Sequence, residues 1–367
     1  MQLETFEKKP LGGADLKVIM KTLMSEGQKG ADELLEKQLK EIKPIGVKLP
    51  ADHVVLMLGG SNGILRAVTL QLLFGEKIPV YGVHYDRANL QIGYNHVESI
   101  KKEAAKQNID SRWWNIDATD PKAIEEVVNT IKEKYSVVHL INGIAAGATK
   151  RYEEHGTIKV KDIDLSYHPV YQYPDFSKID NFKKFGMVDV AVANEGDIER
   201  TNKFMGTSTT LWVEPLAKAG LIKKDISIVA FADYDFEKDD PVYGMGPLAG
   251  AKILQRKSMS DAKNNFGVKA VRLCYPAMDT TAIGAIPGGL LMLAMTSVVL
   301  NEKGKFKNLH TLAEETMEIF KPDFNKEELR TDDDFQKMLP EFHARVDALK
   351  VEDFPKAFES LTKVSMP

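Results

Sequence analysis

The strongest constraint on the fold is a regular alternation of short apolar runs with longer amphipathic segments. Strand-like runs occupy residues 53–58, 80–85, 112–116 and 137–141, and helical patterns lie between them at 64–74, 95–107 and 121–134. Two further strand-like runs follow at 226–231 and 268–273. Strands separated by helices at this spacing pair in parallel, with helices on both faces of the sheet. Because such crossovers are right-handed, the pattern predicts a doubly wound α/β fold.

The rest of the chain divides around this sheet. Residues 1–50 form a charged N-terminal helical segment in this interpretation, and residues 51–367 form a single elaborated Rossmann-type domain. The stretch at about 150–195 is rich in Tyr, Pro, Lys and Asp, and we interpret it as an insertion over the sheet with room for a hairpin. C-terminal helices are expected at about 289–367. These added segments are expected to form the substrate-binding region.

Composition excludes several classes of function. The 367 residues include 49 basic and 53 acidic side chains, and a net charge of −4 gives no general attraction to nucleic acid or anionic lipid. The single cysteine, Cys274, excludes a disulfide framework and a cysteine-based zinc site. The eight histidines show no metal-ligand spacing, so no metal is expected. Residues 1–10 lack the pattern of a signal peptide, which favours a cytoplasmic protein.

One segment reaches the length of a membrane span. Residues 280–300 contain no charged side chain. Pro287, Gly288 and Gly289 interrupt this stretch, and proline and glycine weaken a helix at that point. We therefore expect a buried or interfacial helix from about Gly289, whose flexible apolar side chains would suit the wall of a site for an apolar ligand.

A glycine-rich turn follows the first predicted strand. Gly59, Gly60, Ser61, Asn62 and Gly63 lie between that strand and the first helix. Glycines at this position let the backbone approach a pyrophosphate, and the helix N-terminus supplies free N–H donors. The pattern predicts a dinucleotide site because of its strand–turn–helix placement. The alternative is a tight turn that binds no ligand.

Asp86 ends the second strand and indicates which dinucleotide is bound. A carboxylate there accepts hydrogen bonds from a ribose diol and repels a 2′-phosphate, which favours NADH. Arg87 follows at once and is suited to a 2′-phosphate, so NADPH is not excluded. The alternative for this pair is a solvated strand end.

Two more strand ends carry candidate cofactor residues. Asp117 and Ala118 follow the third strand, where contact with an adenine edge is expected. Ile144 and Ala145 lie in a run of small residues after the fourth strand, which lets a cofactor lie close.

Tyr243 and Lys252 are the candidate catalytic pair. They stand nine residues apart, which in one unbroken helix would place them on opposite faces. Gly244, Gly246 and Pro247 exclude that arrangement, because Pro247 suits the first turn of a helix. Tyr243 is therefore expected in the loop before the helix, and Lys252 on the helix. A lysine near a phenol favours the phenolate and also binds a ribose hydroxyl. Taken without further context, a surface-loop tyrosine is the competing interpretation.

With this pair, the chain resembles the trans-2-enoyl-CoA reductases and the related bacterial enoyl-acyl-carrier-protein reductases that carry a Tyr-x8-Lys signature. These belong to the short-chain dehydrogenase/reductase superfamily. The resemblance covers about residue 50 to the C-terminus. Besides Tyr243 and Lys252, it includes the stretches Trp212–Ile222, Ala277–Pro287 and Glu328–Asp333.

The resemblance implies an NADH-dependent reduction of 2-enoyl thioesters in fatty acid metabolism by a monomeric enzyme. Tyr243 would hydrogen-bond the thioester carbonyl, while Lys252 would hold cofactor oxygen atoms and keep the tyrosine acidic. Thr280 matches a threonine that lies against the nicotinamide and phosphates. The apolar helix after Pro287 would line the acyl-chain tunnel. The resemblance leaves two points open: the carrier, which is coenzyme A or acyl carrier protein, and the length of the acyl chain.

The chain departs from the family pattern at four places, the first of which is residues 1–50, where the family's usual N-terminal segment is not recognisable. Leu65 stands where the family has a further glycine, two positions after the glycine matching Gly63. The family's second active-site tyrosine matches Asp233 without a gap, and Tyr234 serves only if the loop is shifted by one residue. Asp86 replaces a glutamate. Two alternatives stay open. Because a fold does not fix a substrate, one is a reductase of this fold acting on another carbonyl or enone. The other, motivated by Leu65 and Asp233, is a dinucleotide-binding homologue without catalysis.

Overall fold

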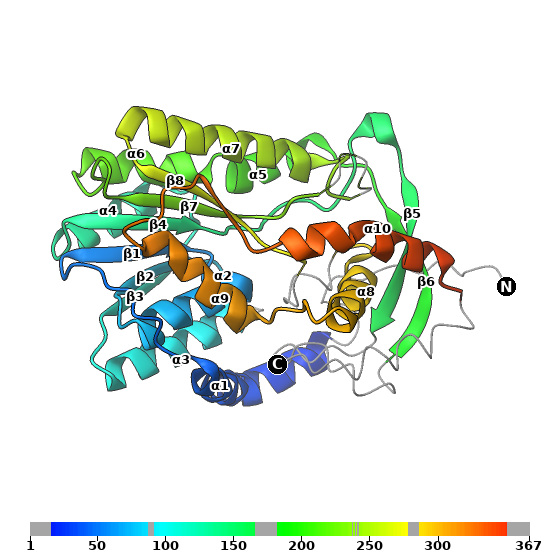
Figure 1. Cartoon of the computed structure of the whole chain (residues 1–367), viewed down its shortest axis with the longest axis horizontal. Coiled ribbons are helices and arrows are strands. Elements are labelled where there is room, and N and C mark those ends of the chain that lie inside the picture. Colours follow the sequence, from blue (N-terminus) through cyan, green and yellow to red (C-terminus); the bar gives the residue numbers. More distant parts are fainter. Residues whose placement is uncertain are drawn as a thin grey trace.

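A seven-stranded parallel sheet forms the centre of the structure (Figure 1). The computed structural model describes residues 16–86, 92–165, 182–236, 238, 240, 242–277 and 286–350. The strand order is β3-β2-β1-β4-β7-β8-β9. The strands of this sheet are β1 (His53–Leu58), β2 (Val80–His84), β3 (Ser111–Asn115), β4 (Val137–Asn142), β7 (Ile228–Asp233), β8 (Lys269–Cys274) and β9 (Glu328–Arg330). A separate antiparallel hairpin consists of β5 (Ile158–Leu165) and β6 (Phe182–Val190).

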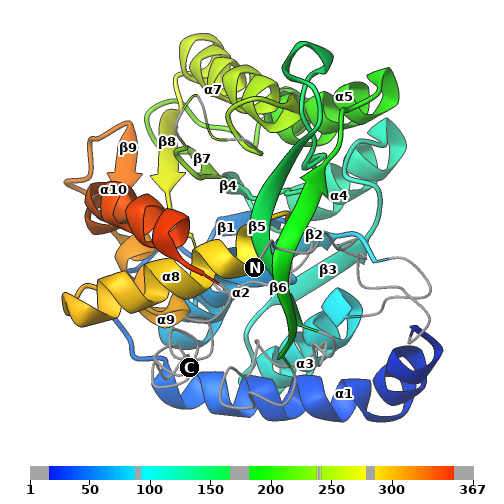
Figure 2. The ribbon, with the colours of Figure 1, turned by 90° about the vertical axis from the view of Figure 1, so that its right-hand side faces the viewer.

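Helices cover both faces of the sheet, as the alternating pattern predicts. The α-helices of the described residues are α1 (Leu16–Glu41), α2 (Gly63–Leu70), α3 (Ile92–Lys106), α4 (Pro121–Lys132), α5 (Glu195–Thr201), α6 (Ser208–Lys218), α7 (Pro247–Phe266), α8 (Gly289–Glu302), α9 (Leu309–Thr316) and α10 (Asp333–Ala348). One face packs against α2, α3 and α9, and the opposite face packs against α4, α6 and α7. The long α1 lies against α3 at the outside of the first layer (Figure 2).

Alternate side chains of β1 supply both halves of the core. All six of its residues are buried. Val55 and Met57 pack into the cluster under α2 and α9, whereas Val54, Leu56 and Leu58 pack into the cluster under α4 and α6. A strand buried on both faces must be apolar without alternation, which explains why the central runs are so easily recognised in the sequence.

The predicted elements agree with the structure except near the C-terminal half of the sheet. The strand predicted at 226–231 lies at 228–233, because residues 224–226 form a turn in which the N–H groups of Ile226 and Ser227 donate to the Lys223 carbonyl. The edge strand β9 was not predicted: it has three residues, two of them charged, and therefore carries no apolar signal. Its Glu328 pairs with Arg272 of β8 at 2.8 Å, a contact that only the folded sheet creates.

The β5–β6 hairpin, α8 and α10 form a second layer beyond the carboxyl end of the sheet (Figures 1 and 2). The hairpin predicted as a feature of the insertion is present. Lys161 of β5 donates hydrogen bonds to the carbonyls of Val346 and Asp347 at the end of α10. Asp162 accepts one from the Gly288 N–H at the start of α8. These bonds fix the apolar α8, which begins at Gly289 as predicted, against the hairpin and α10.

Within the described ranges, no helix combines the length and the apolar character needed to cross a bilayer. The uncharged stretch at 280–300 contributes α8, which is 14 residues long. Side chains of α8 pack instead with those of α10 in an apolar cluster that includes Leu293, Phe335 and Leu339. Protein, rather than lipid, is therefore what covers these side chains.

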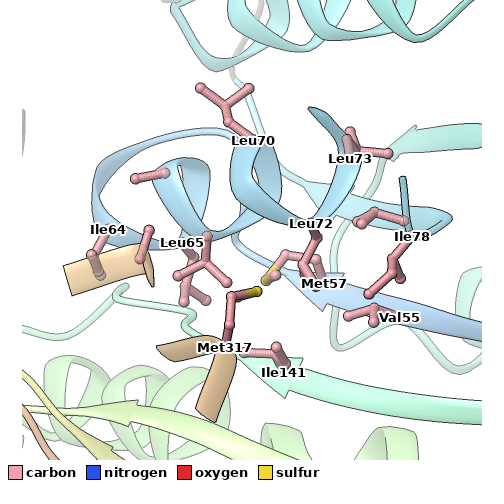
Figure 3. Close-up of a cluster of buried hydrophobic side chains, with 14 of the residues drawn as sticks. Val55, Met57, Ile64, Leu65, Leu70, Leu72, Leu73, Ile78, Ile141 and Met317 are labelled. Carbon is pink, nitrogen blue, oxygen red and sulfur yellow. The ribbon is translucent and has the colours of Figure 1, made fainter. Parts of the chain in front are cut away.

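Leu65 occupies space that a glycine on the neighbouring loop leaves open. Figure 3 shows it among the side chains of Met57, Ile141 and Met317, and it is 2% exposed. A Cβ added to Gly143, just after β4, would lie 2.1 Å from Leu65 Cδ1. The side chain that departs from the family's glycine pattern thus points into the helix–sheet contact, and Gly143 compensates for its size.

We expect Gly143→Ala to lower the free energy of unfolding by about 1–3 kcal/mol, the usual cost of overpacking a core. Leu65→Ala alone should cost about 2–5 kcal/mol by leaving a cavity. In the double variant the alanine at 143 enters that cavity, so the combined cost should be smaller than the sum. Urea denaturation of the four proteins measures this coupling, and strictly additive costs would show that the two residues do not share this space.

His139 is a buried histidine that the fold holds neutral. It is 2% exposed, and its Nδ1 accepts the N–H of Ile228 at 3.2 Å. Its Nε2 lies 3.0 Å from Nδ1 of His53. Burial, together with the charge of His53, lowers the pKa of His139 from 6.5 to about 3. As expected from the sequence, this strand histidine serves packing, with both ring nitrogens in contact with neighbouring groups.

This pKa predicts a loss of stability in mild acid. The unfolded chain takes up a proton at His139 below about pH 6.5, whereas the folded chain does not until about pH 3. Between pH 7 and pH 5 this histidine should therefore lower the free energy of unfolding by about 2 kcal/mol. Denaturation of His139→Asn, whose side-chain oxygen replaces Nδ1 as the acceptor, should show a weaker pH dependence than the parent. Replacement of the exposed His155 by asparagine should leave the pH dependence of stability as in the parent. An unchanged pH dependence in His139→Asn would contradict the assignment of this effect to His139.

Candidate active site

The glycine-rich turn brings the loops after β1 and β4 into contact. Gly59 and Gly63 have φ of +83° and +62°, which residues with a side chain rarely adopt. A Cβ on Gly59 would lie 3.0 Å from the carbonyl oxygen of Gly143. A Cβ on Gly60 would lie 2.4 Å from Met57 Cγ. The turn therefore needs glycine at these positions. It is followed directly by α2, which begins at Gly63.

Asp86, Ser61 and Asn62 converge around one glycine of α3. The site that a Cβ of Gly93 would fill is 2.6 Å from Asp86 Oδ2, 2.8 Å from Ser61 Oγ and 3.1 Å from Asn62 Nδ2. The absence of a side chain at Gly93 thus lets the end of β2 meet the glycine-rich turn. His84 holds the carboxylate, with its Nδ1 3.0 Å from Asp86 Oδ2.

The remaining predicted cofactor residues follow β3 and β4. The Asp117 carboxylate accepts hydrogen bonds from the N–H and the hydroxyl of Thr119, at 2.8 and 2.7 Å. Ala118 is turned inward: its methyl group packs in the core and its carbonyl accepts the indole N–H of Trp212. Ile144 is half-buried and Ala145 is exposed beyond the end of β4. At the end of β3, the side chain of Asp117 is therefore available for contact with a cofactor, whereas the side chain of Ala118 is not.

All these residues lie at the carboxyl ends of β1, β2, β3 and β4. The strand order reverses between β1 and β4, and a crevice at such a reversal is where doubly wound sheets bind dinucleotides. The positive φ values, the missing side chains and the helix N-terminus at Gly63 suit the close approach of a pyrophosphate. The residues present therefore fit a dinucleotide. Thr280, the last predicted contact, lies outside the described residues.

Tyr243 belongs to an aromatic cluster before α7. As predicted, it precedes the helix that begins at Pro247, and Lys252 lies on that helix. The ring centroids of Tyr243 and Tyr234 are 5.1 Å apart, and Phe236 stacks on Tyr243 at 5.8 Å. The backbone N–H of Tyr243 donates to Asp240. The structure thus brings both predicted tyrosines together, although they are separated by one residue fewer than in the family pattern.

The pKa of Tyr243 moves opposite to the expected direction. Burial raises it well above the ordinary value of 10, and the negative charge of Asp240 adds to the effect. The expectation that Lys252 keeps this phenol acidic is therefore wrong for this structure. Tyr243 stays protonated at neutral pH and is a hydrogen-bond donor.

The ammonium group of Lys252 is held at the end of β7. It lies 3.0 Å from Asp233 Oδ1 and donates to the carbonyl of Ala232 at 3.2 Å and to the side chain of Gln255 at 3.3 Å. Asp233 has a fully buried side chain and also pairs with Arg256. Sequence reasoning recorded Asp233 only as a mismatch, because its partner is 19 residues away and nothing in the local pattern links them.

A continuous set of contacts joins the two halves of the site. Gly59 approaches Gly143, and the position of a Gly143 Cβ is 3.6 Å from the Cβ of Ala232. The carbonyl of Ala232 then accepts from Lys252. The glycine-rich turn and the Lys252 ammonium are therefore neighbours on one edge of the sheet.

Comparisons with known proteins agree with this geometry. Residues 90–321 match the family model of the trans-2-enoyl-CoA reductase catalytic region. The chain is 25% identical to the trans-2-enoyl-CoA reductase [NADH] of Clostridium perfringens, over 90% of each chain. It is 24% identical to the enoyl-[acyl-carrier-protein] reductase [NADH] of Burkholderia vietnamiensis, over 87% of this chain and 82% of the relative.

Solved structures share the fold. A Clostridium trans-2-enoyl-CoA reductase in complex with NADH superposes with a TM-score of 0.75 at 19% identity, over 92% of this chain and 89% of the other. The Treponema denticola trans-2-enoyl-CoA reductase in complex with NAD gives 0.68 at 18% identity, over 92% and 91%. The family match spans well over half of the chain, and the sheet, glycine-rich turn and Tyr-x8-Lys pair accompany it. The chain therefore belongs to the trans-2-enoyl-CoA reductase family.

Proposed function

We propose that this protein reduces the 2,3 double bond of trans-2-enoyl thioesters with NADH. The observation that carries the proposal is the carboxyl end of the sheet, where the dinucleotide-type turn at Gly59–Gly63 lies near Lys252, the helix of which follows the loop of the partly buried Tyr243. The names of the matched relatives supply the substrate class, an enoyl group on coenzyme A or acyl carrier protein. The role fits fatty acid metabolism in the cytoplasm.

Tyr243 activates the thioester in this proposal. When bound, NADH would supply the hydride for the β-carbon, and a proton from solvent would complete the reduction at the α-carbon. As the hydride arrives, negative charge develops on the thioester oxygen, and the Tyr243 hydroxyl donates a hydrogen bond to it. Because the pKa of this phenol is raised, the group keeps its proton and acts as a neutral donor at neutral pH. Lys252 contributes an ammonium group for cofactor oxygen atoms.

Apolar side chains beside Tyr234 supply a surface for the acyl chain. The Tyr234 hydroxyl lies 3.6 Å from the sulfur of Met292 on α8, and its ring is 5.9 Å from Phe335 of α10. Met292 is only partly buried, so part of this flexible side chain stays available for contact. We propose that α8, which contacts Tyr234, forms one wall of the acyl-chain site.

The first test is Tyr243→Phe, assayed with crotonyl-CoA and NADH by the loss of NADH absorbance. Removing the donor should lower kcat by about 100-fold or more, as expected for a group that acts on the developing charge. The affinity for NADH should change little. Tyr94→Phe removes a hydroxyl from an exposed tyrosine of α3 and should retain full activity. Full activity of Tyr243→Phe would refute the assigned role, and a parent protein without turnover on any enoyl thioester would refute the function.

The second test concerns the choice of NADH over NADPH. The Asp86 carboxylate stands at the end of β2, where a 2′-phosphate would meet its negative charge. Asp86→Asn should raise kcat/KM for NADPH by about tenfold and lower that for NADH, because the repulsion and the ribose acceptor are both lost. The charge-matched control Asp261→Asn, on the exposed side of α7, should leave the ratio of the two kcat/KM values unchanged. An unchanged ratio in Asp86→Asn would remove Asp86 from the specificity site.

A further inference from the structure

Lys252 has one charged partner among the described residues, and that partner is buried more deeply than the lysine itself. The Asp233 side chain is 0% exposed and lies 3.0 Å from the ammonium group. The other two acceptors, the Ala232 carbonyl and the Gln255 amide, are neutral and lie at 3.2 and 3.3 Å. All three contacts are charge-assisted because the donor is an ammonium, but only Asp233 adds the attraction of an opposite charge, and its burial leaves that attraction poorly screened. The Asp233 bond is therefore the one that fixes the position of the ammonium.

We propose that Asp233 is a positioning residue that anchors Lys252 at the cofactor edge of the sheet. The inference rests on the proposed function only in taking Lys252 as a contact for cofactor oxygen atoms. A hydroxyl of a bound nucleotide can replace either neutral acceptor, while the ion pair with Asp233 stays in place. The lysine is thereby set in its binding position before the cofactor arrives, which lowers the cost of ordering it on binding.

The surrounding charges make Asp233 necessary for this position. Arg256 and Arg272 lie 3.1 and 3.3 Å from its second carboxylate oxygen, Oδ2. Three cations thus converge on one buried carboxylate. Without its charge, Lys252 would lose its anionic partner and would lie near two guanidinium groups that stay paired with Asp235, a carboxylate that has no contact with the lysine in the described part of the chain. The ammonium would then move away from the end of β7.

A neighbouring carboxylate provides the matched control. Asp235 pairs with the same two arginines, at 3.0 Å to Arg256 and 2.6 Å to Arg272, and also with Arg330. No contact joins it to Lys252 within the portion of the chain that the structure describes. Asp235→Asn thus disturbs the arginine network but leaves the lysine its partner, so comparison with Asp233→Asn separates positioning of Lys252 from general support of the fold.

The experiment measures NADH affinity by isothermal titration calorimetry on the full chain, without substrate. Asp233→Asn should weaken binding by about tenfold, the range for losing a hydrogen bond to a charged group. Asp235→Asn should weaken it less than about threefold. In a Lys252→Ala background, Asp233→Asn should have almost no further effect, because the group through which it acts is gone.

Two results would overturn the proposal. One is an equal loss of affinity from Asp233→Asn in the presence and absence of the lysine. The other is an equal loss from Asp235→Asn. If Asp233→Asn fails to fold, the double variant Asp233→Asn/Arg256→Gln replaces it, because it removes one cation together with the anion. This variant should show the same tenfold loss of NADH affinity. Unchanged affinity would also reject the role of Asp233 as an anchor. The calorimetric measurements need no turnover. A parent protein that binds NADH but does not reduce enoyl thioesters would therefore contradict the proposed function without contradicting the role of Asp233.

Discussion

The parallel pairing of β1 with β4 is the contact on which the rest of the site depends. The two strands run together from the His53–Val137 pair to the Leu58–Asn142 pair, so their following loops begin at the same level. That shared level brings Gly59 against Gly143 with no room for a side chain on either. The predicted cofactor residues that follow β1 and β4 take their positions from this pairing.

Packing below the loops explains how the chain tolerates its departures from the family pattern. Leu65 adds volume beneath the glycine-rich turn, and Gly143 removes volume at the same place. Gly93 likewise makes room where Asp86 and Ser61 meet. The size of the Leu65 side chain is therefore accommodated by a glycine that is distant from it in the sequence. The dinucleotide-binding alternative without catalysis loses much of its motivation, because Leu65 points into the core.

Electrostatics divides the site into two regions. Around Tyr243 the neighbours are aromatic side chains, and burial keeps the phenol protonated. Around Lys252 the neighbours are charged, and burial of Asp233 is offset by cations that keep the pKa of that carboxyl below its ordinary value. The structure thus provides a neutral donor in the loop before α7 and a fixed cation on α7 itself. This division suits a reaction in which one group meets the developing charge of the substrate and the other holds the cofactor.

The sequence by itself determined the parallel sheet, the glycine-rich turn and the place of Tyr243 before the helix of Lys252. These follow from local signals: apolar runs buried on both faces, glycine at a strand end, and Pro247 at a first helical turn. Only the tertiary structure decided the edge strand β9, the pairing of Leu65 with Gly143 and the bond between Asp233 and Lys252. It also reversed the expected pKa shift of Tyr243. The physical reason is that these features depend on which distant residues share a buried volume or a buried charge, and no local pattern records that.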